Sequence, residues 1–245
     1  MQIIYGIHPV LETLKRTPRE IEKIILTPGR KGKEIEEIVS RAERNRVPLE
    51  YRHRESLEAM TGSRVHQGVA CVCKDFHYTG VDELLARCQN SCNDSVILLL
   101  DCIEDPQNLG SLIRTAHCFG VDGIIIPERR AAPVTPAVIK VSAGAARYIP
   151  IARIANLADV LDRMKEAGFW IFGTSAEGGR HLRGLEYGKK AALVLGGEGK
   201  GMRPLIQKKC DFLISIPMAG SIDSLNVAVA GGIIMHEIMS RTVKS

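Results

Sequence analysis

The alternation of short apolar runs with helical patterns is the feature that most constrains the fold of this chain. Runs such as SVILLLD (95–101), VDGIIIP (121–127) and AALVLG (191–196) have the length of strands, and segments with apolar residues at helical spacing lie between such runs. Strands and helices that alternate along a sequence are typical of α/β proteins, because the two kinds of element pack in layers around one core. The sequence therefore predicts an α/β fold.

The same pattern divides the chain into two parts joined by a polar segment. Residues 1–74 contain four strand-like runs and three helical patterns, which predicts a first compact domain. Residues 75–93 are polar and rich in turn formers around one short helical stretch, which is typical of a linker. Residues 94–245 begin again with a strand and continue the alternation, which predicts a second, larger domain.

Composition limits the class of protein. Of the 245 residues 45% are apolar and 25% are charged, as in folded globular proteins. No apolar run reaches the ~18 residues that a membrane span needs. The first residues, MQIIYGIHPVLE, lack the basic region, apolar core and cleavage site of a secretory signal. We therefore expect a cytoplasmic protein without a membrane partner.

Cysteine spacing and charge indicate the kind of partner. The seven cysteines are an odd set without a Cys-x-x-Cys pair or a paired Cys/His spacing, which predicts free thiols and no metal site. The net charge is +5, and residues 1–74 hold 14 Lys/Arg against 10 Asp/Glu, so most of the positive excess lies in the first part. This charge permits an anionic partner such as nucleic acid.

Three stretches of the second part share one feature, a strand that runs into a loop of Gly, Asn, Ser or acidic residues before the next helix. They are DPQNLGSLIRTAHCFG (105–120), LVLGGEGKGM (193–202) and SIPMAGSIDSLNVAVAGG (215–232). In open α/β sheets, ligands bind beyond the carboxyl ends of strands, where such loops meet. We therefore predict one pocket built from all three stretches.

The first stretch is expected to form a helix that begins near Asn108. Arg114 falls on a different face of this helix from the apolar residues, so it can meet a ligand or form an ordinary surface ion pair. The apolar residues expected to face the core are Leu109, Leu112, Ile113 and Ala116.

The second stretch carries four glycines in six residues, around Glu198 and Lys200. It is not a phosphate-binding P-loop, because no hydroxyl residue follows Lys200, and the spacing of its glycines does not match the dinucleotide fingerprint. A loop with this composition can approach a ligand closely or take positive φ angles, and it can also be a plain turn.

The third stretch is expected to open a helix at Ser224. A Ser or Asp before an apolar run accepts a hydrogen bond from an unpaired N–H of the first turn, so capping explains one polar residue here. We interpret Asp223 as such a cap, because a carboxylate at a helix N-terminus is also favoured by the helix dipole. Capping leaves the other polar residues of the loop, among them Ser221 and Asn226, to be explained.

In order and spacing, the three stretches together resemble the three motifs of the SpoU (TrmH) branch of the SPOUT RNA methyltransferases. Residues 1–74, with YGIHPVLETL near their start and HQGVACV near their end, look like the small L30e-like domain that binds the RNA substrate in one subgroup. The resemblance therefore covers essentially the whole chain. It is strongest to the bacterial enzymes that methylate a guanosine 2′-hydroxyl in 23S rRNA.

This resemblance implies a homodimer whose SPOUT-type α/β domain is threaded into a deep trefoil knot. It implies S-adenosylmethionine as the cofactor, RNA as the partner and no metal. Backbone groups at Gly196, Ile216 and Leu225 would hold the adenine and ribose of the cofactor. The implied cofactor-binding residues are Thr174, Gly196, Gly197, Glu198, Gly201, Ile216, Met218, Ser224 and Leu225. The implied active-site residues are Asn108, Arg114, Glu198, Ser224 and Asn226.

The chemistry suits these residues. Methyl transfer from a sulfonium to a 2′-oxygen is an in-line displacement that needs alignment and partial desolvation, and the hydroxyl must lose a proton. The resemblance implies that Arg114 activates the hydroxyl. An arginine, with a pKa above ~12, is a poor base, so a clamp on the neighbouring phosphate is the alternative role, and the sequence leaves both open.

Other functions stay open at this level. A tRNA-directed enzyme of the same family is the main alternative. A non-catalytic rRNA-binding factor is another, since the basic first part could bind RNA through phosphate contacts alone. The missing dinucleotide fingerprint argues against a nicotinamide-dependent oxidoreductase.

Overall fold

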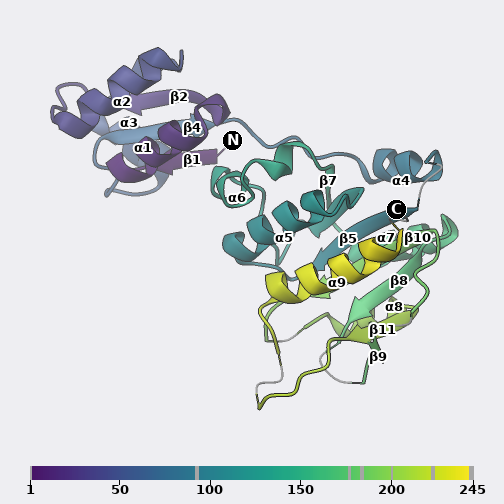
Figure 1. The fold of residues 1–245 in the computed structure, drawn as a ribbon. Coiled ribbons are helices and arrows are strands. Elements are labelled where there is room, and N and C mark those ends of the chain that lie inside the picture. The colour runs from purple at the N-terminus through teal and green to yellow at the C-terminus, as the bar shows by residue number, and fades with distance from the viewer. Residues whose placement is uncertain are drawn as a thin grey trace. The chain divides into compact units, whose positions relative to one another are not determined.

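The computed structural model describes residues 2–91, 94–175, 178–182, 185–199, 201–221 and 224–242. The chain divides into two compact units (Figure 1). The first contains residues up to 77 together with 135–140, and the second contains residues 78–134 together with those from 141 onward.

The first unit is a four-stranded sheet with helices on both faces. In sheet order the strands are β1 (Gln2–Tyr5), β4 (Val69–Cys73), β2 (Ile21–Leu26) and β3 (Leu49–Tyr51). Strand β4 runs antiparallel to β1 and β2, and β3 runs parallel to β2. The helices are α1 (Ile7–Arg16), α2 (Lys33–Arg44), α3 (Arg54–Thr61) and a 3₁₀ turn over Pro18–Glu20.

Neighbouring residues of β2 pack on opposite faces of this sheet, because successive side chains of a strand point to opposite sides. Ile24 packs with Val10 of α1 and Ile38 of α2, whereas Ile25 packs with Leu57 of α3. All five residues of β4 are buried, as expected for a strand covered on both faces.

The second unit is a seven-stranded sheet in which every pair of neighbours is parallel. In sheet order the strands are β7 (Ile151–Ile154), β6 (Gly123–Pro127), β5 (Ser95–Asp101), β10 (Lys190–Gly196), β8 (Trp170–Thr174), β11 (Phe212–Ser215) and β9 (Arg180–His181). Its helices are α4 (Val81–Gln89), α5 (Pro106–Cys118), a 3₁₀ turn over Ala145–Arg147, α7 (Leu157–Glu166), α8 (Pro204–Lys209) and α9 (Val227–Thr242). Helix α6 (Pro136–Val141) belongs, except for its last residue, to the first unit. The α/β expectation is confirmed.

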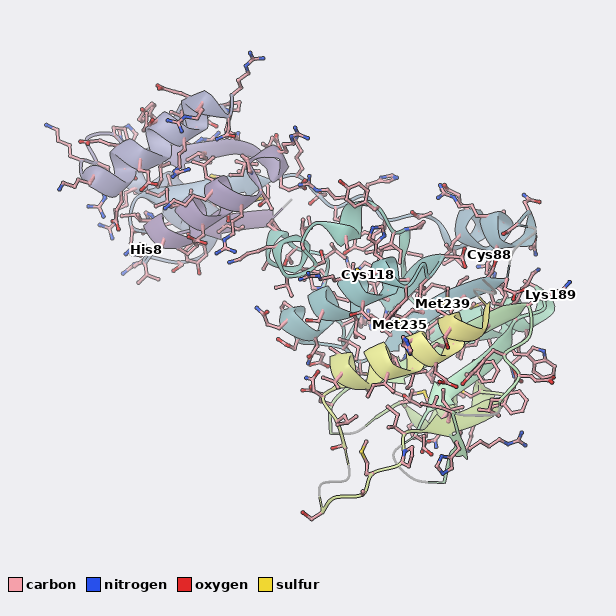
Figure 2. All side chains as sticks on the ribbon, in the orientation of Figure 1. His8, Cys88, Cys118, Lys189, Met235 and Met239 are labelled. Carbon is pink, nitrogen blue, oxygen red and sulfur yellow. The ribbon has the colours of Figure 1, made fainter. Side chains whose placement is uncertain are left out.

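Helices cover this sheet in two groups. Helices α4, α7 and α8 share one core cluster with β5 and β10, whereas α5 and α9 contact each other and lie side by side in Figure 1. At Gly231 of α9 an added Cβ would come within 2.6 Å of Leu112 on α5 and 2.7 Å of Leu195 on β10, so the glycine permits this close packing. Figure 2 shows Met235 and Met239 further along α9, and Met235 is fully buried.

The second unit begins at Tyr78, inside the segment for which the sequence predicts a linker. Helix α4 packs on the core there, because Leu84 and Leu85 on its apolar face are buried. Gly123 of β6 makes room for Leu84, since an added Cβ at that glycine would clash with its side chain. The Tyr78 hydroxyl also accepts a 2.9 Å hydrogen bond from the backbone N–H of Val134.

The start of α9 differs from the expectation. The helix begins at Val227 rather than Ser224. Its cap is Asn226, whose Oδ1 accepts hydrogen bonds from the backbone N–H groups of Ala228 at 2.9 Å and Val229 at 3.4 Å. Asn is as good an N-cap as Ser, so the residue next to the first turn serves as the cap. The predicted cap Asp223 lies outside the described residues.

Three further observations concern the kinds of site available. In the described part of the chain, no helix is long and apolar enough to cross a membrane. Those residues also contain no group of three or more His, Cys, Asp or Glu side chains that could hold a metal ion. The six described cysteines are free thiols.

Candidate active site

The site forms at the carboxyl edge of the second sheet. Strands β5, β10, β8 and β11 are parallel and adjacent, so the loops that follow them leave the sheet at one edge. The three polar stretches follow β5, β10 and β11 and therefore meet there. This is the arrangement that the sequence predicts.

The glycine loop after β10 is folded tightly back on itself. An added Cβ would clash with the backbone of Met202 at Gly196 and with the carbonyl oxygen of Cys102 at Gly197, so neither position admits a side chain. The N–H of Gly201 donates to the carbonyl oxygen of Gly197 at 3.0 Å and closes the loop. Glu198 is thereby held on a short, constrained turn.

Three side chains, one from each stretch, form what we call the amide–carboxylate cluster: Asn108, Glu198 and Asn226. Oε1 of Glu198 accepts a 3.0 Å hydrogen bond from Nδ2 of Asn108 and a 2.7 Å bond from Nδ2 of Asn226. Nδ2 of Asn226 also donates to Oδ1 of Asn108 at 2.9 Å. Hydrogen bonds to a carboxylate are stronger than those between neutral groups, so the cluster ties the three stretches together.

Local structure positions the two amides of this cluster. Asn108 lies in the first turn of α5 and is 9% exposed. Its backbone N–H donates to Oδ2 of the capping residue Asp105 at 2.9 Å. Asn226 is held at the start of α9, because its Oδ1 caps that helix while its Nδ2 donates to the other two members of the cluster.

A cavity of about 420 Å³ opens beside the cluster, and we call it the glycine-loop cavity. Its apolar walls come from Leu195, Ile214 and Ile234. Every residue that the resemblance implies for cofactor binding lines it: Thr174, Gly196, Gly197, Glu198, Gly201, Ile216, Met218, Ser224 and Leu225.

A second cavity of about 690 Å³, the arginine cavity, also has Glu198 in its lining. Gly197, Glu198 and Val227 line both cavities, and Asn108 lines the arginine cavity. The two cavities therefore meet at the amide–carboxylate cluster.

The sequence analysis missed the charged lining of the arginine cavity, in which Arg130 and Arg203 stand together with the acidic residues Glu104 and Asp105. Arg203 is held in place, since its backbone N–H and its Nε donate to the two oxygens of the fully buried Asp101 at 2.8 and 2.7 Å. Asp101 ends the apolar run SVILLLD, and an acid at the carboxyl end of a buried strand is a signal that could have pointed to this side of the site.

The thiol of Cys102 also lines the arginine cavity. Burial, together with the adjacent Asp101 carboxylate, raises the pKa of this thiol. The thiol is therefore protonated at neutral pH and is no candidate nucleophile, because the thiolate is the reactive form.

Two predicted site residues stand apart from the cluster. Arg114 is exposed on α5 and lines neither cavity, and no residue of the described ranges pairs with its guanidinium. The surface ion pair considered for it is therefore not found among those residues. Ser224 lines the glycine-loop cavity but makes no hydrogen bond to the cluster. Lys200 lies outside the described residues.

Comparison with protein families decides what kind of protein carries this site. Residues 95–236 match the SpoU rRNA Methylase family. The chain belongs to the SpoU family. Residues 3–79 match a second family, described as RNA 2′-O ribose methyltransferase substrate binding. The resemblance drawn from the three motifs is thereby confirmed.

Curated relatives of this SpoU protein carry names that include both RNA classes. A TrmH family tRNA/rRNA methyltransferase of Staphylococcus aureus (strain MSSA476) is 39% identical over 239 residues, which cover 98% of this chain and 96% of that protein. The TrmH family tRNA/rRNA methyltransferase YacO of Bacillus subtilis (strain 168) is 39% identical over 235 residues, which cover 96% and 94%.

Solved structures share the fold of the SpoU protein. An AdoMet-bound rRNA methyltransferase from Sinorhizobium meliloti aligns with a TM-score of 0.64 at 24% identity, covering 99% of this chain and 88% of that one. AviRb from Streptomyces viridochromogenes, in complex with AdoMet, aligns with a TM-score of 0.64 at 23% identity, covering 99% and 91%. A TrmH/SpoU tRNA modifying enzyme from A. aeolicus aligns over 66% of this chain and 83% of that one, with a TM-score of 0.56 at 28% identity.

Proposed function

We propose that this SpoU family protein transfers a methyl group from S-adenosylmethionine to a ribose 2′-hydroxyl of RNA, with a guanosine of 23S rRNA in the cytoplasm as its target. The observation that carries the proposal is the amide–carboxylate cluster at the junction of two cavities. One cavity can hold the methyl donor, the other can receive the acceptor nucleotide, and the cluster lies where the reacting groups must meet.

The glycine-loop cavity fits the methyl donor. Gly196, Gly197 and Gly201 line this cavity, so their backbone groups can meet an adenosine. Met218 and Leu225, each 38% exposed, offer apolar side chains to the adenine. When bound, S-adenosylmethionine supplies a methyl group on a positively charged sulfur, and the Glu198 carboxylate lies in the lining to favour that charge.

We assign the acceptor nucleotide to the arginine cavity through Arg130, although the carboxylates of Glu104 and Asp105 also stand in its lining. Arg130 supplies a guanidinium that pairs with no carboxylate within the described ranges, and it can meet a phosphate of the RNA backbone. Asn108 and Glu198 border this cavity and can align the ribose 2′-hydroxyl. Alignment of the two reactants is a main requirement of such a displacement.

Proton removal completes the reaction. The 2′-oxygen forms a bond to the methyl carbon, the carbon–sulfur bond breaks and leaves a neutral thioether, and the hydroxyl releases its proton to water or to a phosphate oxygen. We give Arg114 the role of clamping a phosphate of the RNA backbone outside the two cavities, because its guanidinium is exposed, lines neither cavity and is not engaged by any residue that the structure describes. Ser224 and Asn226 complete the proposed catalytic set.

The oligomeric state and the knot belong to the same proposal. Val229 and Ile233 lie one turn apart on α9 and are 52% and 42% exposed. Such an apolar stripe fits a second copy of this chain, which supports the homodimer that the family implies. The insertion of β10 between β5 and β8 is compatible with a C-terminal segment threaded through a trefoil knot.

A tRNA target is the second candidate. It is favoured by the names of the curated relatives, which include tRNA, and by the likeness to a tRNA modifying enzyme of the TrmH/SpoU type. The match of residues 3–79 to a substrate-binding domain is compatible with either RNA.

The deciding experiment maps 2′-O-methylation across rRNA and tRNA in cells with and without this protein. We expect one rRNA guanosine to lose its methyl group when the gene is removed. Loss from a tRNA instead would move the target to the second candidate. Titration calorimetry of the intact chain with S-adenosylmethionine tests the donor site separately, and absence of binding would overturn the enzymatic proposal.

A further inference from the structure

Three arginines converge on one cavity of the first unit. This cavity has a volume of about 420 Å³, and its lining includes Thr27, Arg30, Arg54, Arg64, Val65 and Gly68. The topology of the sheet explains why residues so far apart meet. Strands β2 and β3 are parallel and β4 runs against them, so the ends of β2 and β3 and the start of β4 lie at one edge.

Two turns hold Arg30 in this cavity. The first is TPGR (27–30), in which the N–H of Arg30 donates to the carbonyl oxygen of Thr27 at 3.4 Å and Gly29 takes a φ of 77°. Pro followed by a glycine with positive φ is the signature of a type II turn. The turn places Arg30 directly after β2.

The second turn belongs to the HQG sequence (66–68) that precedes β4. Gln67 and Gly68 have φ angles of 55° and 73°, and the N–H of Gly68 donates to Nδ1 of His66 at 3.0 Å. This conformation aims the carbonyl oxygen of Gln67 at Arg30, whose Nε donates to it at 3.1 Å. An added Cβ at Gly68 would lie 3.1 Å from that Nε, so the guanidinium stem packs on the bare glycine.

Charge around the cavity is strongly positive. Glu58 is the only carboxylate paired with these arginines among the described residues, and it is not part of the lining. Its oxygens lie 3.1 Å from Nε of Arg54 and 3.9 Å from Nε of Arg64. Arg64 is 90% exposed and Arg54 is 67% exposed, so both guanidinium groups remain accessible.

A hydroxyl in the lining lacks its expected partner. Oγ1 of Thr27 is buried and makes no hydrogen bond within the described structure. Buried polar groups are normally hydrogen-bonded, so an unpartnered hydroxyl in the lining of a cationic cavity points to a ligand that accepts a hydrogen bond. Beside it Val65 is 75% exposed and offers an apolar surface.

We propose that Arg30, Arg54, Arg64 and Thr27 form a phosphate-binding site through which the first unit grips the backbone of its RNA substrate. Guanidinium forks match the geometry of phosphate oxygens, the Thr27 hydroxyl supplies a further donor, and Val65 contacts the adjoining sugar or base. The proposal rests on RNA being the substrate, and it goes further by naming the residues that hold it.

RNA binding by the full-length chain tests this site, with purified 23S rRNA as the probe and filter binding over a series of KCl concentrations as the measurement. We expect Arg30→Ala and Arg64→Ala each to weaken binding about tenfold, which is the loss of one charge-assisted contact. Each should also reduce the slope of log affinity against log salt by roughly 0.7 to 0.9, as one phosphate contact is lost.

Arg44→Ala is the matched control, since it removes one positive charge from the same unit at the end of α2, outside this cavity. The site is overturned if the Arg30 and Arg64 variants keep the affinity and salt slope of the Arg44 variant. Glu58→Gln distinguishes the loss of a phosphate contact from damage to the fold. It removes the carboxylate that competes with phosphate for Arg54 and Arg64, so RNA binding should become tighter. A misfolded domain would not bind more tightly.

S-adenosylmethionine binding by the same variants separates this proposal from the proposed function. Donor affinity should be unchanged in every variant, because the glycine-loop cavity lies in the other unit. If the unaltered chain binds no donor, the enzymatic proposal fails, whereas the RNA measurements still decide whether the phosphate site exists.

Discussion

Nδ2 of Asn226 donates a 2.9 Å hydrogen bond to Oδ1 of Asn108, a residue 118 positions earlier in the chain. The same Asn226 caps α9 through its Oδ1. One side chain therefore links the start of α9 to the first turn of α5 and to the glycine loop. Because of this double role, the stability of α9 and the geometry of the candidate active site depend on the same residue.

Substitution of Asn226 separates its two roles. Asn226→Ala should lower the free energy of unfolding by about 0.5–2 kcal/mol through loss of the cap, and it should slow methyl transfer. Asn226→Ser keeps a capping oxygen but loses the bonds to Asn108 and Glu198, so most of the stability should return while transfer stays slow. Denaturant unfolding and single-turnover kinetics measure the two effects. Recovery of both by Ser would contradict a role in the cluster.

Arg114→Lys tests the guanidinium on α5. It keeps the charge but loses the planar fork, so we expect kcat to fall roughly ten- to a hundred-fold, as for one charge-assisted contact of ~1.5–3 kcal/mol. Donor affinity and thermal stability should change little, because Arg114 is exposed and is not bonded to any described residue. Arg163→Lys, on α7, is the control. A wild-type kcat in the Arg114→Lys variant would show that a positive charge alone suffices there.

Glu198→Gln tests the charge in the glycine-loop cavity. Gln keeps an oxygen that can accept from the two amides but carries no charge to favour a sulfonium. We expect the affinity for S-adenosylmethionine to fall about fivefold, a loss of about 1 kcal/mol. The loss is small because water can reach the pair formed by the Glu198 carboxylate and the sulfonium. S-adenosylhomocysteine, whose sulfur is neutral, is the control ligand, and its affinity should be the same for the variant and the wild type. Equal losses for both ligands, measured by calorimetry, would show that Glu198 acts only through geometry.

Cys210 gives a prediction on alkaline stability. Burial raises the pKa of this thiol from an ordinary value of 9.0 to about 12. The unfolded chain then loses its proton at lower pH than the folded chain does. The contribution of Cys210 to stability is therefore present below about pH 9 and is lost as the pH rises toward about 12.

Alkaline unfolding of Cys210→Ala measures this contribution. The variant should show a flatter dependence of the unfolding free energy on pH than the wild type between about pH 9 and about pH 12. Cys118→Ala, which removes an exposed thiol on α5, should retain the wild-type slope. If the unfolding free energy of the Cys210 variant and of the wild type depends on pH with the same slope, Cys210 does not make this contribution.

Much of the fold was predictable because local patterns report burial. The run SVILLLD forms a strand in which all seven residues are buried, as its unbroken apolar sequence predicts. The glycines around Glu198 predict either a close approach of the backbone or a plain turn, and at Gly196 and Gly197 an added Cβ would clash with neighbouring backbone. The three polar stretches also meet at one edge, since parallel neighbouring strands leave no other arrangement for the loops that follow them.

Other features depended on contacts that no local pattern encodes. Helix α9 begins at Val227 and not at Ser224, and the residue that bonds the N–H groups of its first turn is Asn226. Strand β7 is only four residues long and is interrupted by the exposed Arg153, so its local sequence does not indicate a strand. Helix α4 lies in the predicted linker, and only the burial of its apolar face assigns it to the second unit.

The sequence by itself determined the α/β class, the family and the three stretches that build the site, because spacing along the chain records which residues must be buried and where the backbone must turn. Only the tertiary structure decided that Asn108, Glu198 and Asn226 share hydrogen bonds while Arg114 stands apart, and that three arginines of the first unit face one cavity. The physical reason is that the order of strands in a sheet decides which loop ends become neighbours, and hydrogen bonds then form between atoms that lie close in space, whatever their separation in sequence.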